Sequence, residues 1–340
     1  MLKTLYTFYE KVWQKDTFYE KVWQKSGANT DTTYVLRTVP LFATLFATLF
    51  CKKCIFNKNK IDLHNIILNS TYNITYNKKM KITLDDTRKI GKLANIFCHL
   101  KPFTDNVVIY FKPAGIYIQC MDDSHCALFE CTLDKKWFTI YDFNVANDMP
   151  SASLNIGMFY KVLNAREDDQ TMEIELTKEE EDNIFISFNG GKTSKYFELP
   201  LINIDHDVLN IDSIKETDID LTIEAKTLCD LINQLMIFDE VLTMTFSEEK
   251  IDMKSSGNEG SMKVDMKIDD LKEYAIAEHS KLVQSYSLKY IHLMCQFNKL
   301  AGEISMGFSK DKPMTMRYDL LDESSVVIHL APKVRDDTTF

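Results

Sequence analysis

The strongest constraint on the fold of this 340-residue chain is an order of strand and helix patterns that occurs twice. Residues 107–111 form a strand-like apolar run and residues 116–119 begin an alternating one, and residues 241–246 and 251–254 match these two segments about 135 positions later. Period-two alternation predicts strands with one buried face. Each set of strands lies between two amphipathic segments, so the sequence predicts an α+β fold built from two similar domains.

Four segments carry apolar residues at helical spacing. They cover residues 86–100, 154–165, 224–238 and 288–300. Asp85 or Asp86 can cap the first. Opposite its apolar face, each segment has a polar and partly basic face. One such face is what an ordinary solvated helix presents, but four of them in an acidic chain predict a surface that meets phosphates.

The stretch 116–130 predicts a strand, a tight turn and a second strand. In the turn, Asp122, Asp123 and His125 suit metal binding or acid–base chemistry. Asp and Ser in hairpin turns more often bond their own backbone. The second half has an ordinary turn, S-G-N-E-G at 256–260, at the matching place. This match favours the turn-forming interpretation.

Charge is distributed unevenly along the chain, whose net charge is -10. Residues 1–80 hold 12 Lys and Arg against 5 Asp and Glu, a net charge of +7, and the remainder has a net charge of -17. Such an acidic body excludes nucleic-acid binding over its whole surface, so cations that meet DNA must gather on one face. Eight scattered cysteines favour a reducing compartment, and no apolar run is long enough to span a membrane.

Residues 1–80 differ from the rest of the chain. The nonapeptide T-F-Y-E-K-V-W-Q-K at 7–15 recurs at 17–25, and L-F-A-T at 41–44 recurs at 45–48. Repeats this short do not build a solenoid. The composition predicts a low-complexity, disordered extension, with a targeting or partner-binding helix as the alternative. The C-x-x-C at 51–54 lacks a second ligand pair for zinc, and Met80 is a plausible alternative start.

No other motif predicts chemistry. The triplet D-H-D at 205–207 resembles metal ligands but lies in a predicted linker, where exposed charge is ordinary. Cys120, Cys126 and Cys131 are expected to be small core residues. The chain has no glycine-rich nucleotide loop and no known hydrolase motif. We therefore predict no catalytic residue, no metal and no cofactor.

From about Lys81 to Arg335 the chain resembles the proliferating cell nuclear antigen (PCNA) family of sliding clamps. The resemblance rests on I-Q-C-M-D-D-S-H at 118–125, Y-S-L-K-Y at 286–290 and L-A-P-K at 330–333. The resemblance implies a DNA-clamp fold with clamp domains at 81–199 and 218–335. A linker at 200–217 joins the domains, and a tail follows at 336–340.

The family also implies function. Three chains would close head to tail into a homotrimeric ring, with helices lining the hole and sheets outside. The ring would encircle double-stranded DNA independently of sequence, as a non-enzymatic processivity factor. Partners would be DNA polymerase, a clamp loader and other proteins carrying clamp-binding peptides. The location would be the nucleus, or a cytoplasmic viral replication site if the Lys-, Asn- and Ile-rich composition reflects a large DNA virus.

The resemblance implies three sets of site residues. DNA-facing side chains would be Arg88, Lys92, Lys161, Lys226, Lys289 and Lys299. The partner-peptide pocket would comprise Met121, His125, Leu128, Leu209, Ile211, Pro313, Ala331, Pro332 and Lys333. The subunit interface would join Lys195, Tyr196 and Phe197 of one chain to Met262, Val264 and Met266 of the next.

The chain departs from the family pattern at three places. The third helix offers Lys226 but also Asp230, His329 replaces an aromatic residue, and S-E-E-K at 247–250 stands where many clamps carry a modifiable lysine. Two alternative functions stay open. One is a subunit of a heterotrimeric checkpoint-type clamp, and the other is a metal-dependent hydrolase that uses the Asp122 turn.

Overall fold

The computed structural model describes the ordered body of the chain. The described residues are 79–143, 150–177, 182–204, 208–212 and 216–333. All of them belong to the second of two compact units, 71–340. The predictions for the N-terminal extension, the C-x-x-C pair and the triplet at 205–207 lie outside the described residues.

Four α-helices occupy the segments where helical spacing predicts them. They are α7 (Thr87–Leu100), α8 (Ile156–Leu163), α9 (Ala225–Leu235) and α10 (Leu288–Cys295). Asp86 caps α7 by accepting from the Arg88 amide, as predicted, and Asn155 caps α8. The last predicted turn of α10 is the 3-10 helix η5, Gln296–Lys299. Amphipathic spacing thus located all four helices, with ends that differ by a few residues.

Eighteen strands form three antiparallel sheets in the described part of the chain. The first half contributes β1 (Lys79–Leu84), β2 (Asn106–Lys112), β3 (Gly115–Met121), β4 (Ala127–Asp134), β5 (Ile140–Phe143), β6 (Ser151–Asn155), β7 (Thr171–Thr177), β8 (Asn183–Asn189) and β9 (Lys195–Pro200). The second half contributes β10 (Ile219–Glu224), β11 (Val241–Phe246), β12 (Lys250–Gly257), β13 (Gly260–Lys267), β14 (Glu273–Ile276), β15 (Leu282–Ser287), β16 (Glu303–Phe308), β17 (Met314–Asp319) and β18 (Ser325–Leu330).

The two halves have the same order of elements. Each runs through one strand, a helix, five strands, a second helix and three strands. Mostly β-structure with four amphipathic α-helices confirms the predicted α+β clamp fold. One predicted strand, 137–141, is wrong in part because Asp134 caps the 3-10 turn η2 (Lys135–Trp137), which delays the strand until Ile140.

The three sheets differ in how they use the two halves. The orders are β5-β1-β7-β8-β9, then β13-β12-β11-β15, and the nine-stranded β14-β10-β16-β17-β18-β4-β3-β2-β6. In the last, β18 of the second half pairs with β4 of the first, with Ile328 opposite Phe129. We call this pairing the internal junction. It makes one continuous sheet out of strands from both halves.

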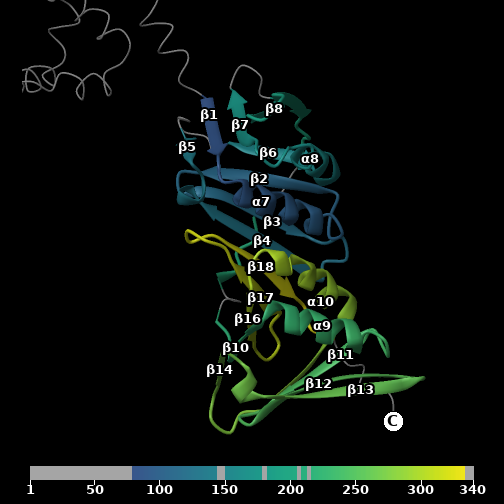
Figure 1. Cartoon of the computed structure of the whole chain (residues 1–340). Coiled ribbons are helices and arrows are strands. Elements are labelled where there is room, and N and C mark those ends of the chain that lie inside the picture. Colours follow the sequence, from purple (N-terminus) through teal and green to yellow (C-terminus); the bar gives the residue numbers. More distant parts are fainter. Residues whose placement is uncertain (1–78, 144–149, 178–181, 205–207, 213–215, 334–340) are drawn as a thin grey trace, which may run out of the picture. The chain divides into compact units, whose positions relative to one another are not determined.

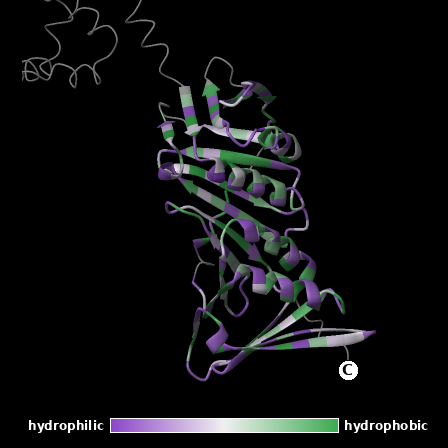
Figure 2. Ribbon diagram, viewed as in Figure 1, coloured by the Kyte–Doolittle hydropathy of each residue, from purple (hydrophilic) through white to green (hydrophobic). Residues whose placement is uncertain are grey.

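The helices pack on the sheets as a row. α7 contacts α8 and η5, and α9 contacts α10, so the row passes from one half to the other (Figure 1). Their apolar faces join one buried core with the sheets. Hydrophilic residues recur along the ribbons of these helices (Figure 2). Within the described residues, no helix is long and apolar enough to cross a membrane.

Candidate nucleic-acid interface and docking surface

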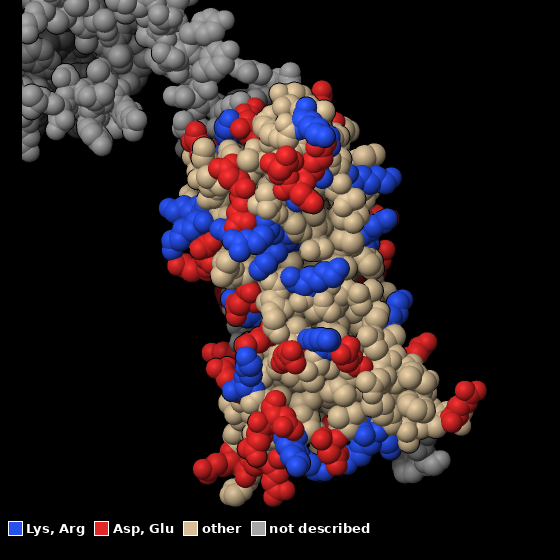
Figure 3. Space-filling view, in the orientation of Figure 1, with Lys and Arg blue, Asp and Glu red and all other residues tan. Residues whose placement is uncertain are grey.

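The predicted DNA-facing side chains all lie on the helix row. Arg88, Lys161, Lys226, Lys289 and Lys299 are exposed, and Lys92 is half-buried. Figure 3 shows several Lys and Arg side chains across the middle of this face, with Asp and Glu beside some of them and in larger groups toward its two ends. The structure therefore places these cations on one side of the molecule, as phosphate binding requires.

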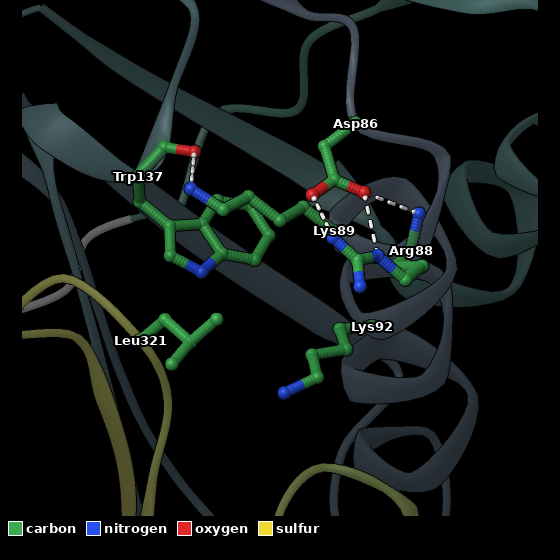
Figure 4. A pocket seen from close by; sticks show the side chains of 6 residues that line it. All are labelled: Asp86, Arg88, Lys89, Lys92, Trp137 and Leu321. Carbon is green, nitrogen blue, oxygen red and sulfur yellow. Dashed lines mark hydrogen bonds and ion pairs between the residues drawn. The ribbon is translucent and has the colours of Figure 1, made fainter.

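Three basic residues lie close together at the start of α7, and they differ in their hydrogen-bond partners (Figure 4). Arg88 bonds the Asp86 carboxylate, its own helix cap. Lys89 donates to the Trp137 carbonyl at 3.0 Å and to Asp322 at 2.6 Å, so it stabilises the packing of α7 on the body. Burial, and then the charge of Arg88, lower the pKa of Lys92. Lys92 is the cation of this group that no described carboxylate pairs with directly.

The two halves meet on this face at His99 of α7. Its ring centroid lies 5.6 Å from that of Phe297 in η5. Burial, and then the positive charge of Lys299, lower the pKa of His99. The imidazole is therefore held neutral more strongly than a free histidine, which leaves Lys299 as the cation at this point.

One exposed cation of this face was not predicted. Lys101 caps the C-terminus of α7, and its Cε would lie 3.8 Å from a Cβ built on Gly157 of α8. Helical periodicity ends before Lys101, so the amphipathic pattern gave no reason to include it. Its contact with the next helix was visible only in the fold.

The turn after β3 is built around Asp122. Its carboxylate accepts from the amides of Ser124, Cys126 and Ala127 at 3.0, 2.7 and 2.6 Å, and from the Tyr290 hydroxyl. Burial alone would raise the pKa of Asp122, but these hydrogen bonds together lower it. The interpretation of Asp122 as a turn-former is confirmed. Within the described chain, no group of three His, Cys, Asp or Glu residues is placed to hold a metal.

The cysteines near this turn are only partly as predicted. Cys120 and Cys131 are buried, whereas Cys126 is exposed, so the prediction of a core residue is wrong there. The Cys126 amide donates a hydrogen bond to the Asp122 carboxylate, and this bond holds Cys126 in the turn rather than in the strand. The backbone requirement of the turn outweighs the apolar character of the side chain.

A segment of the predicted linker lies across β3. The Gln119 side chain accepts from the Leu209 amide at 2.7 Å and donates to the Leu209 carbonyl at 3.1 Å. Ile211 is buried, whereas Leu209 is 46% exposed. Gln119 thus fixes the linker on the sheet. Gln119 is part of the motif at 118–125, but the sequence alone did not predict a role for its side chain.

The C-terminal segment approaches the same turn. The Ala331 amide donates to the Cys126 carbonyl at 2.9 Å, and the Lys333 amide to the Ser285 carbonyl at 2.7 Å. The structure therefore brings the hairpin turn, the linker and the segment 331–333 onto neighbouring strands. Of the predicted pocket residues, Leu128 and Ile211 are buried, and His125, Leu209, Ala331 and Lys333 are exposed.

His329 lies beneath this surface instead of on it. It is 3% exposed, and its Nε2 lies 3.4 Å from the Glu130 carboxylate across the internal junction. Glu130 also accepts from the Tyr117 hydroxyl, and burial followed by this hydrogen bond raises the pKa of that phenol. His329 therefore stabilises the pairing of β18 with β4.

Among the described strands, each of the three sheets ends in two strands that have a neighbour on one side only, and β9 and β13 are two of these six. Within the described residues, β9 pairs only with β8, and β13 only with β12. Tyr196 on β9 is 76% exposed, and β13 alternates exposed residues with half-buried Met262, Val264 and Met266. These strands are the predicted interface strands. We call them the open edges.

Comparisons with known proteins agree with the predicted resemblance. The Rad9 family model matches residues 93–331. The proliferating cell nuclear antigen 1 of Plasmodium falciparum is 25% identical over 262 residues, which cover 72% of this chain and 94% of that protein. The proliferating cell nuclear antigen 2 of Drosophila melanogaster is 25% identical over 226 residues (65% and 86%). The DNA polymerase sliding clamp of Thermococcus onnurineus is 23% identical over 245 residues (72% and 95%).

Proposed function

Because this chain belongs to the Rad9/PCNA family of sliding clamps, we propose that it is a ring-forming processivity factor that encircles duplex DNA. The observation that carries this proposal is the helix row with its one-sided set of exposed lysines. Helices present these cations to phosphates without base contacts, so DNA binding is independent of sequence and sensitive to salt.

The ring is a homotrimer in this proposal. Its two clamp domains are residues 81–199 and 218–335, joined by 200–217. The open edges β9 and β13 come from different halves of the chain, so a head-to-tail contact of β9 with β13 can repeat until the ring closes. Exposed Tyr196 and the half-buried Met262 support this contact, since no other described strand pairs with the free sides of β9 and β13.

The docking surface receives peptides of DNA polymerase, of the clamp loader and of other replication proteins. The hairpin turn, the linker at Leu209 and the segment 331–333 converge on neighbouring strands. Leu209 at 46% and Val283 at 45% exposure offer apolar surface at the linker and on β15. A role in DNA replication places the protein in the nucleus, or at a cytoplasmic viral replication site if the source is viral.

Polymerase extension on primed circular DNA, with a clamp loader present, tests the function. We expect longer products with the protein than without it. Tyr196→Ala should lengthen the products less than wild type, because it removes an exposed side chain of the proposed subunit contact and leaves the core intact. Product lengths that do not change on addition of the wild-type chain contradict the proposal.

A charge-reversal variant tests the DNA-facing assignment. Lys92→Glu, Lys161→Glu and Lys289→Glu together should abolish retention on circular DNA while the trimer stays intact. The control reverses Lys192, Lys254 and Lys310, which are also exposed but lie outside the four helices. Equal retention by the two triple variants contradicts the assignment of the helix row to DNA.

A second candidate is a subunit of a heterotrimeric checkpoint-type clamp, which the match to the Rad9 family favours. In that case the open edges would pair with different chains. Native mass measurement of the protein alone separates the two functions. A trimer supports the homotrimeric clamp, and a stable monomer at all accessible concentrations supports the checkpoint-type subunit.

A further inference from the structure

The internal junction is a template for the contact between chains. By element order, β9 in the first half corresponds to β18 in the second, and β13 corresponds to β4. Pairing β9 with β13 would give the order β5-β1-β7-β8-β9-β13-β12-β11-β15. Strand for strand, this is the order of the existing nine-stranded sheet. The template therefore specifies which edges meet.

The strand registers specify which residues correspond. Paired residues can be followed from strand to strand through β1, β7, β8 and β9, and in the same way through β10, β16, β17 and β18. In this comparison Phe197 occupies the position of Ile328, and Glu198 occupies that of His329. The burial patterns agree, since Leu199 and Leu330 are both buried at the next position.

The same count applies to the opposing strands. Across β2, β3 and β4, and across β11, β12 and β13, it places Met262 at the position of Phe129 and Lys263 at that of Glu130. Ile328 faces Phe129 in the internal junction. Phe197 therefore faces Met262 of a second copy, with Tyr196 facing Lys263.

The polar pair of the internal junction corresponds to a second pair, in which the acidic residue lies on the opposite strand. His329 and Glu130 lie diagonally across β18 and β4, with ring and carboxylate atoms 3.4 Å apart. The corresponding residues are Glu198 on β9 and Lys263 on β13. The acidic group has moved from one strand of the pair to the other, and the pair remains complementary.

From these correspondences we infer that Glu198 of one chain forms an ion pair with Lys263 of the next, in the register that sets Phe197 opposite Met262. The inference rests on the proposed ring and identifies the partner of each open edge as a second copy of this chain. A chain that assembled only with different partners would not need its own two edges to match.

Both groups are already oriented by neighbours on their own sheets. Glu198 accepts from the Asn183 amide group at 2.7 Å. Lys263 Nζ lies 2.7 Å from Asp265 and 3.5 Å from Asp252. An approaching Glu198 therefore extends an existing network of alternating charge. The reversal also discriminates between strands, because Glu198 placed against β4 would meet Glu130, a like charge.

A charge swap on the full chain tests the pair, with assembly followed by native mass and sedimentation. Glu198→Lys and Lys263→Glu should each raise the concentration of half-assembly by about tenfold or more. The double variant should return to within about threefold of wild type. Lys267→Glu is the matched control, since its transferred partner position is residue 192, beyond β9; it should assemble as wild type.

Cross-linking tests the register independently, in a Cys126→Ser background because Cys126 is exposed. Phe197→Cys with Met262→Cys places thiols on directly opposed residues and should give oxidised trimers, whereas Phe197→Cys with Val264→Cys should not. Single variants without effect, a double variant that is not rescued, or preferential cross-linking at Val264 would overturn the inference while the wild-type ring stands. A wild-type chain that never assembles would instead overturn the proposed ring, and the pairing with it.

Discussion

Strands β4 and β13 hold the same position in the two halves, yet their surroundings differ. β4 has β3 on one side and β18 on the other, and five of its eight residues are buried hydrophobics. β13 pairs only with β12 among the described strands, and none of its eight residues is buried, although it carries Met262, Val264 and Met266. A strand with alternating apolar residues becomes core or edge according to what covers it.

β4 and β13 should also differ in how much they contribute to the cooperative folding of the chain. The internal junction joins strands from both halves, so its disruption should cost the fold of the whole chain. The open edges contribute little to the folded monomer and should matter for assembly.

The largest expected effect comes from equivalent core and edge positions. Phe129, 1% exposed and 5.7 Å from the Phe297 ring, should lose about 3–5 kcal/mol of unfolding free energy in Phe129→Ala. Met262→Ala, at the equivalent place in β13, should cost the monomer about 1 kcal/mol or less but weaken assembly. Urea unfolding at low protein concentration measures both. Equal losses would show that β13 is covered within the monomer.

The two hairpin turns give the next contrast. Asp122→Ala removes the acceptor of three backbone amides and of Tyr290, and should cost about 2–4 kcal/mol. Asn258→Ala changes an exposed residue in the β12–β13 turn and should stay within about 0.5 kcal/mol. Because the pKa of Asp122 is lowered in the folded state, its stabilisation is present above the ordinary aspartate value and is lost as pH falls through the folded value. An Asp122→Ala variant as stable as wild type contradicts this account.

The helices of the two halves should differ in their contribution to DNA binding. Lys92 of α7 has no directly paired carboxylate among the described residues, whereas exposed Asp230 lies one turn beyond Lys226 on α9. Lys92→Glu should therefore reduce the salt dependence of DNA binding by about one phosphate contact, and Lys226→Glu by less. Titrations at several salt concentrations measure the slopes. A larger change for Lys226→Glu would reverse the comparison.

Local patterns were sufficient to predict the helices, the central hairpin and the α+β class. Alternation at 116–130 predicted β3, the turn and β4, because the side-chain period follows directly from the backbone. The short strands β5, β6, β14 and β15 were mostly missed or displaced. Their four to six residues are too few for a periodic signal, and their pairing partners fix them.

Side-chain roles were harder to predict than elements. Lys89 stands among the basic residues of α7, yet it bonds the Trp137 carbonyl and Asp322, which is 233 positions away. His329 was identified only as a replacement for an aromatic residue of the family pattern, yet it is buried beside Glu130. Each outcome depends on a contact between distant segments, which no local pattern contains. The same limitation applies to Gln119 and the linker.

The smallest expected effect concerns pH at the helix contact between the halves. The folded pKa of His99 is lowered by burial and by Lys299, so the folded chain binds this proton less readily than the unfolded chain. Stability from neutral His99 is present above about pH 6.5 and is lost as pH falls through the folded value. His99→Gln should therefore flatten the decrease of Tm on acidification by no more than about 2 °C. His279→Gln is the matched control, because the side chain of His279 is 93% exposed and distant in sequence from this contact. A slope that changes for His279→Gln but not for His99→Gln would remove the helix contact as the source of the pH dependence.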